Sequence, residues 1–175
     1  DPALIGLAMG VYGLTQALMQ VPLGLASDRF GRKKIIVLGL VVFALGSLLA
    51  ALADSVQMLA VGRAVQGAGA ISAAVTALLA DLTRDEVRTK GMALVGISIG
   101  LTFALSLMAA PPLAGAIGLS GLFWLTAALA LIGIGVVLGI TPAEPARHAD
   151  MPRGKLSDVW LHPQLWRLDL GVFVL

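Results

Sequence analysis

Long runs without charged residues dominate this sequence. Asp, Glu, Lys and Arg are absent from residues 2–27, 35–53 and 91–143, and Arg63 is the single one in residues 55–80. A helix needs about 20 apolar residues to cross a bilayer, and the last run is long enough for two crossings. Turn-forming residues from Pro111 to Gly121 divide it. The pattern predicts an all-α membrane protein with crossings at about 3–27, 35–53, 56–81, 90–111 and 121–141.

The composition excludes several other classes of protein. The chain is 58% hydrophobic and 13% charged, with a mean hydropathy of +0.95, whereas soluble domains carry about 25% charged residues. A soluble enzyme domain, a disordered chain and a nucleic-acid-binding module do not fit these values. The absence of cysteine excludes a disulfide framework and thiolate metal sites. The partner that this composition predicts is the lipid bilayer.

The basic residues fall on alternate links between the predicted crossings. Every Lys and Arg except Arg63 lies in the first link, in the third link or after the fifth crossing. Basic residues mark the cytoplasmic side of a membrane protein. The distribution predicts a multi-pass topology in which residues 3–27 run from the outside to the inside. The expected location is a bacterial inner membrane.

The segment after the fifth crossing differs from the rest of the chain. Residues 142–165 contain four prolines and both histidines, and we interpret them as a cytoplasmic linker after an N-terminal bundle at 1–141. The helical spacing of three apolar residues predicts a short helix on the membrane surface within this linker. These residues are Leu156, Val159 and Trp160. Residues 166–175 predict the start of a further crossing.

The first link carries a specific motif. It reads GLASDRFGRKKII and resembles the signature loop of the major facilitator superfamily, G-x-L-a-D-R-x-G-R-K-x-x-l, with Ala26 in place of the usual Leu. The matching residues include Gly24, Asp28, Arg29, Gly31, Arg32 and Lys33. Glycine at position 24 allows close helix approach, and glycine at position 31 permits a tight reversal. The alternative interpretation is a basic loop that only anchors the topology.

The resemblance implies a gating role for this loop. In the superfamily the loop latches the cytoplasmic side, and an acidic residue at the cytoplasmic end of the fourth helix is its partner. Asp81 occupies that place in this sequence. We therefore expect Asp28, Arg32 and Asp81 to form a charge relay.

A second motif surrounds the single charge within a crossing. Arg63 lies about 10 Å into its helix at 1.5 Å per residue, where an arginine costs roughly 2.5–3.5 kcal/mol. The stretch GRAVQGAGA resembles the superfamily motif R-x-x-Q-G-x-g-a, in which the arginine is linked to proton coupling. The resemblance implies a cavity or coupling role for Arg63, Gln66 and Gly67. The alternative is an arginine that extends to the outer interface.

A third motif is degenerate. Antiporters of the superfamily often end their fifth helix with G-P-x-x-G-G, and here Ala110, Pro111 and Gly115 take three of these places, with Ser106 one turn earlier. Pro111 should bend or end the helix at this point. Small residues preserve close packing, so this stretch favours antiport weakly, and a packing seam is the alternative.

The resemblance as a whole implies a secondary active transporter, and the drug–proton antiporter branch fits it best. The expected fold is that of the superfamily: helices two to six of its N-terminal six-helix bundle, the central linker and the start of helix seven. The implied partners are a small-molecule substrate, protons and a C-terminal six-helix half of the same chain. No cofactor, metal or catalytic residue is expected, because the proton gradient supplies the energy. The alternatives are a sugar or organic-acid symporter, a uniporter, and a membrane scaffold or sensor that does not transport.

Overall fold

The computed structural model describes residues 2–69 and 71–144. Five helices follow one another: α1 (Pro2–Phe30), α2 (Arg32–Ala51), α3 (Val56–Ala68), α4 (Ser72–Leu82) and α5 (Asp85–Gly139). Three segments in this part of the chain are long and apolar enough to cross a membrane: Arg32–Ala51, Val56–Leu82 and Asp85–Gly139. The described region is therefore the all-helical bundle that the charge-free runs predict.

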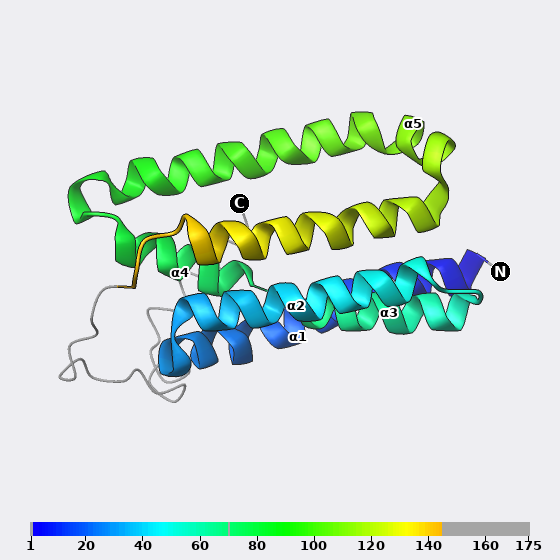
Figure 1. The fold of residues 1–175 in the computed structure, drawn as a ribbon, viewed down its shortest axis with the longest axis horizontal. Helices are drawn as coiled ribbons and strands as arrows, with labels where there is room; N and C mark the ends of the chain where they lie inside the picture. The colour runs from blue at the N-terminus through cyan, green and yellow to red at the C-terminus, as the bar shows by residue number, and fades with distance from the viewer. Residues whose placement is uncertain (1, 70, 145–175) are drawn as a thin grey trace, which may run out of the picture. The chain divides into compact units, whose positions relative to one another are not determined.

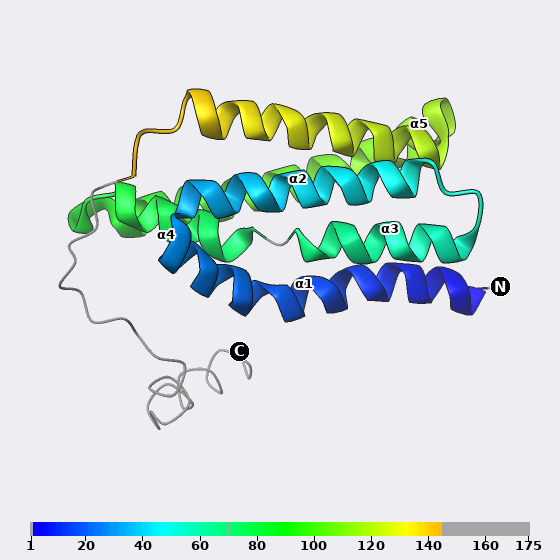
Figure 2. The ribbon, with the colours of Figure 1, turned by 60° about the horizontal axis from the view of Figure 1, so that its bottom comes forward.

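Helices α1, α2 and α3 form the closely packed part of the bundle. The helix α3 lies along both α1 and α2, and α2 also packs against α5 (Figure 2). Ile35, Ile36, Ala74 and Leu78 form a buried apolar cluster where α2 meets α4. Burial of this small cluster holds the N-terminal end of α2 against α4.

The third predicted crossing is divided in the structure. We expected one helix over 56–81, but α3 ends at Ala68 and α4 begins at Ser72. The division falls after Gly67 and Gly69, and glycine weakens a helix because it adds backbone freedom. Gly67 also lies in close contact with α1, and Gly69 with α2. The closest tertiary contacts of this segment therefore coincide with its residues of lowest helix propensity.

The reversal within α5 falls inside the link predicted between the fourth and fifth crossings, but it is shorter than predicted. We expected a helix to end near Pro111 and the next to begin near Gly121, but α5 continues through Pro111 and Pro112. The backbone is non-helical at Gly118, where φ is 71°. Proline loses its own N–H bond and crowds the carbonyl four residues earlier, but Pro111 and Pro112 keep a helical backbone here, whereas the positive φ at Gly118 favours glycine. Gly118 therefore sets the turn, and α5 forms two antiparallel arms, 85–117 and 119–139 (Figure 1).

The two arms of α5 differ in their contacts. The second arm lies against α2, where Gly133 faces Leu40, and the Ser120 hydroxyl at its start donates to the Ala51 carbonyl. The first arm is mostly exposed within the described part of the chain. The predicted surface helix near Trp160 and the predicted crossing at 166–175 lie outside the described residues.

Candidate functional site

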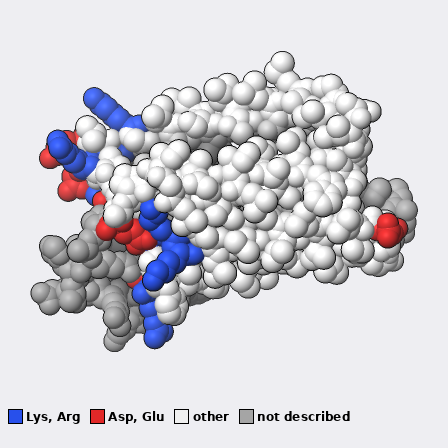
Figure 3. All heavy atoms as spheres, in the orientation of Figure 1, with Lys and Arg blue, Asp and Glu red and all other residues white. Residues whose placement is uncertain are grey.

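Charged side chains gather at one end of the bundle. Figure 3 shows blue and red atoms together at the end where α1 meets α2, and a separate acidic spot at the other end. The first and third predicted links thus lie at the same end, as their basic residues indicate. The signature loop and Asp81 are part of this charged end.

Arg32 is the centre of the charged end. Its Nη1 atom lies 2.8 Å from Oδ1 of Asp28, and its Nε donates to the Asp81 carboxylate. Only 14% of the Arg32 side chain is exposed, against 55% for Asp28 and 39% for Asp81. The structure thus brings together the three residues of the expected relay, and Arg32 links α1 and α2 to α4.

A buried serine supports Arg32 from the α1 side. The Ser27 hydroxyl accepts from Arg32 Nη1 at 3.3 Å and donates to the Gly24 carbonyl at 2.6 Å. Ser27 is fully buried, so this hydroxyl is held in one orientation. Its role was not apparent from the sequence, because serine occurs throughout the apolar runs.

The glycines of the signature loop differ in how tightly they are held. At Gly31 φ is 103°, in the region that favours glycine, and α2 starts one residue later. At Gly24 an added Cβ would lie 3.5 Å from Cβ of Ala73, an ordinary contact. Gly31 is therefore required by the backbone reversal, whereas the approach at Gly24 leaves room for a methyl group.

The remaining basic residues of the loop point to different partners. The Arg29 guanidinium lies 5.4 Å from the centroid of the Phe30 ring. The ammonium of Lys33 donates to the Thr141 carbonyl at 2.8 Å, and the Lys33 backbone N–H donates to the Glu144 carboxylate. Both contacts of Lys33 join the loop to the segment after α5. Spacing along the sequence does not indicate these contacts, because 108 and 111 residues separate the partners.

Arg63 is held inside the bundle by two neighbours. Its Nη1 donates to Oε1 of Gln66 at 2.5 Å, and its Cζ lies 4.1 Å from the centroid of the Tyr12 ring. Among residues 2–69 and 71–144, Arg63 forms no ion pair. A cation over an aromatic face is stabilised by the ring quadrupole, so α1 supplies part of the compensation that this half-buried charge needs.

A hydrogen-bonded chain fixes the side chain of Gln66. The Gln66 Nε2 donates to the Ser47 hydroxyl at 2.8 Å, and Ser47 in turn donates to the Phe43 carbonyl at 2.8 Å. Gln66 is 2% exposed and Ser47 is fully buried. With its nitrogen occupied by Ser47, the amide presents its oxygen to Arg63. The sequence motif indicated Gln66, but nothing in it indicated Ser47.

Glycine contacts bring this chain of residues together. An added Cβ at Gly46 would lie 2.3 Å from the Gln66 nitrogen, and one at Gly62 would lie 2.6 Å from the Ala50 nitrogen. At Gly67 it would lie 2.1 Å from the Thr15 hydroxyl oxygen. Real Cβ atoms do not approach so closely, so α3 reaches α1 and α2 only because side chains are absent at these points.

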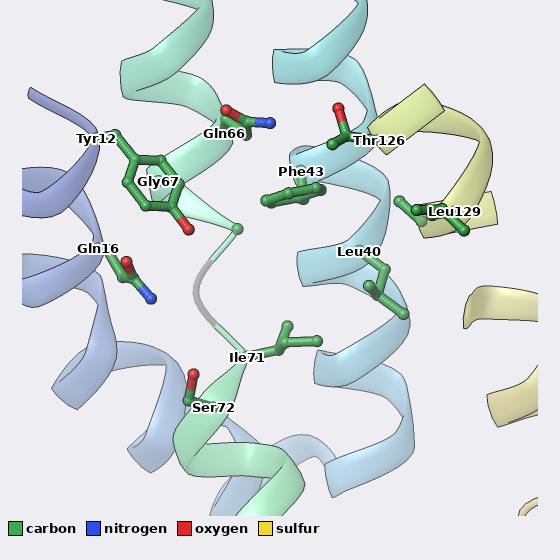
Figure 4. Close-up of a pocket in the computed structure, with 12 residues that line it drawn as sticks. Tyr12, Gln16, Leu40, Phe43, Gln66, Gly67, Ile71, Ser72, Thr126 and Leu129 are labelled. Atoms are coloured by element: carbon green, nitrogen blue, oxygen red, sulfur yellow. The ribbon is translucent and has the colours of Figure 1, made fainter. Parts of the chain in front are cut away.

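A cavity of about 380 Å³ lies beside this network. Figure 4 shows it at the interruption between α3 and α4, with Tyr12, Gln16 and Gln66 around its upper half. Residues of α2, of the start of α4 and of α5 complete the lining, most of them apolar, and no charged residue is among the lining residues. Irregular backbone within a membrane is tolerated where it borders a cavity, and the interruption after Gly69 fits this rule.

The antiporter-like residues lie apart from both charged centres. Ser106, Ala110, Pro111 and Gly115 are on the first arm of α5, and all four are exposed in the described part of the chain. An added Cβ at Gly115 would meet open space. The structure thus brings the signature loop together with Asp81, and Arg63 together with Gln66 and Gly67, but leaves the third motif without contact to either group. Within the described residues no three His, Asp or Glu side chains could hold a metal ion.

The whole chain, residues 1–175, matches the Major Facilitator Superfamily. The Inner membrane transport protein YajR of Escherichia coli is 49% identical over 99% of this chain and 39% of its own length. Multidrug resistance protein 2 of Bacillus subtilis is 35% identical over 73% of this chain and 32% of its own. Tetracycline resistance protein, class B, of Escherichia coli is 35% identical over 65% and 27% respectively.

The chain spans less than half the length of these curated relatives. The match to an inner membrane transport protein, together with the apolar helices, identifies an integral, multi-pass protein of the inner membrane. The expectation drawn from the two motifs is confirmed at the level of the family. This chain belongs to the Major Facilitator Superfamily of membrane transporters.

Proposed function

We propose that this chain is part of a proton-coupled exporter of small molecules that works by alternating access. The observation that carries the proposal is the environment of Arg63, a membrane-embedded cation held by Gln66 and Tyr12 beside a cavity. An ionisable residue inside a membrane is costly, and it marks a transport or proton pathway more often than a structural contact. The names of two relatives, a multidrug and a tetracycline resistance protein, favour export.

The coupling step is assigned to Arg63 and Gln66. Arg63 has no carboxylate partner among the described residues, so its charge is compensated by an amide oxygen and an aromatic face. A charge held this way raises the cost of a second cation nearby and favours an anion. The charge of Arg63 would therefore disfavour a proton or a cationic substrate in the adjacent cavity, and so affect the order in which the two bind.

The gating step is assigned to Asp28, Arg32 and Asp81. Arg32 joins the link between α1 and α2 to the end of α4, so these helices move together at the charged end. In alternating access two bundles rock around a site near the midplane. Neutralising either carboxylate would remove a charge-assisted contact and shift the balance between inward-open and outward-open states.

The test uses the complete protein in proteoliposomes. Efflux of lipophilic cations and neutral drugs is followed with an imposed pH gradient and again after the gradient is collapsed. We expect flux that depends on the gradient, that is lost in Arg63→Ala, and that persists in Arg88→Ala. Arg88 is a suitable control because it is an exposed arginine that pairs with Asp85 in the same helix.

The outcomes separate the alternatives. Flux that ignores the gradient would indicate a uniporter and would leave Arg63 with a structural role only. Flux in the direction of proton entry would indicate a symporter. If Arg63→Ala keeps the gradient-driven flux of the wild type, as Arg88→Ala is expected to do, then proton coupling resides elsewhere in the complete protein.

A further inference from the structure

The first turn of α2 begins without a cap from its own segment. Arg32–Ala51 starts directly after Gly31, which has no side chain to accept a hydrogen bond. The first N–H groups of a helix have no partner within the helix, and Ser, Thr, Asp or Asn at this point normally supplies one. The reversal at Gly31 therefore leaves the start of α2 in need of an acceptor from elsewhere.

The segment after α5 supplies that acceptor. Oε1 of Glu144 accepts from the Lys33 N–H, and Oε2 lies 3.5 Å from where a Cβ at Gly31 would stand. A carboxylate at a helix N-terminus interacts favourably with the partial positive charge there. The nearby carbonyl of Thr141 accepts from the Lys33 ammonium at 2.8 Å. The same residue is thus held through its backbone and through its side chain.

This second attachment lies next to the gate. Arg32 and Lys33 are consecutive residues in the first turn of α2, and each is held by an acidic residue from a distant part of the chain. Asp81 at the end of α4 holds Arg32, and Glu144 after α5 holds Lys33. While Glu144 accepts the Lys33 N–H, it holds the backbone of the first turn of α2. In this arrangement the Arg32 side chain contacts both Asp28 and Asp81.

We propose that Glu144 is a positioning residue of the gate, which caps α2 and ties the segment after α5 to the signature loop. The proposed effect on gating rests on the transport function proposed above, but the capping contact does not. The carboxylate acts through Lys33 and the helix backbone, and among the described residues it forms no hydrogen bond or ion pair with the Arg32 side chain. Movement of the segment after α5 would thereby be transmitted to the gate.

The experiment measures hydrogen exchange of the purified complete protein. Peptides that cover the first turn of α2, 32–38, are compared with peptides from the opposite end of the same helix. Glu144→Ala removes the acceptor, whereas Glu144→Gln keeps a neutral oxygen. Glu86→Gln is the matched control, since Glu86 is an exposed acidic residue in the first turn of α5.

We expect exchange in residues 32–38 to accelerate about fivefold in Glu144→Ala, the size of effect that loss of an N-cap produces. Glu144→Gln should give a smaller increase, and Glu86→Gln none. Unchanged exchange in both Glu144 variants would overturn the capping role. This measurement needs no substrate, so it separates failure of this proposal from failure of the proposed transport function.

A double-variant cycle tests positioning as distinct from simple stabilisation. Glu144→Ala and Asp81→Asn are made singly and together, and exchange is measured in the same peptides. If Glu144 positions Arg32 for Asp81, the double variant should show less than the summed effect of the two single variants. Additive effects would show that Glu144 caps the helix independently of the gate, and would overturn the positioning role.

Discussion

The contact between α2 and α3 leaves no space for a side chain at position 46. A Cβ built on Gly46 would lie 2.3 Å from the nitrogen and 2.6 Å from the Cα of Gln66, and 2.8 Å from the Gly62 carbonyl oxygen. All three atoms belong to the backbone, so rotation of a side chain cannot relieve the overlap. Gly46→Ala therefore forces α2 and α3 apart.

Two effects of opposite sign determine the result of Gly46→Ala. Alanine stabilises a helix interior by roughly 0.5–1 kcal/mol relative to glycine. Overpacking of a close contact costs about 1–3 kcal/mol, and more where backbone must move. The overlap involves backbone on both sides, so the unfavourable effect should be larger. We expect a net loss of about 1–2 kcal/mol in the free energy of unfolding.

The assay is thermal unfolding of the purified complete protein, with Gly135→Ala as the control. Gly135 lies in the second arm of α5, and an added Cβ there would meet open space. We expect a lower unfolding temperature for Gly46→Ala and an unchanged or slightly higher one for Gly135→Ala. If the two variants unfold at the same temperature, then the α2–α3 contact is not as close as the structure describes.

Three further substitutions test the charged end and the Arg63 network. Ser47→Ala should lower the free energy of unfolding by roughly 1–3 kcal/mol, because the buried Gln66 nitrogen loses its acceptor; thermal unfolding beside wild type measures this, and an unchanged value would contradict it. Asp81→Asn should cost less than about 1 kcal/mol in the free energy of unfolding, because Asp81 is 39% exposed. It should nevertheless raise the labelling rate of a single cysteine introduced at the charged end, since the chain has no cysteine of its own, and an unchanged rate would refute the latch. Gly31→Ala should cost roughly 1–3 kcal/mol, because φ is 103°, and denaturation should show a larger loss than for Gly24→Ala, where an added Cβ fits.

The two motifs differ in how far they could be interpreted from the sequence. Asp28 and Arg32 are four residues apart, so they are near each other in the chain, but the reversal at Gly31 places them on different helices. Arg63 and Gln66, three residues apart, are equally local. The contact of Arg32 with Asp81 was expected from the resemblance to the superfamily. Ser47 was not identified at all, because its contact with Gln66 depends on how α2 crosses α3.

The sequence alone determined the class of fold, because the cost of placing charge in a membrane limits where charged residues can stand. It also determined which links share one end of the bundle, since their basic residues follow a rule of orientation that needs no tertiary contact. Both properties are read from composition along the chain and from the spacing of a few residues.

Only the tertiary structure decided where the helices break and what holds the charged end together. The interruption after Gly69 falls where Gly67 and Gly69 pack closely against α1 and α2, and glycine by itself could equally stand in a continuous helix. The acceptor for the start of α2 comes from Glu144, which lies 111 residues further along the chain than its partner. Contacts between residues so far apart in the chain depend on the relative placement of the helices, and the spacing of residues along the sequence does not predict that placement.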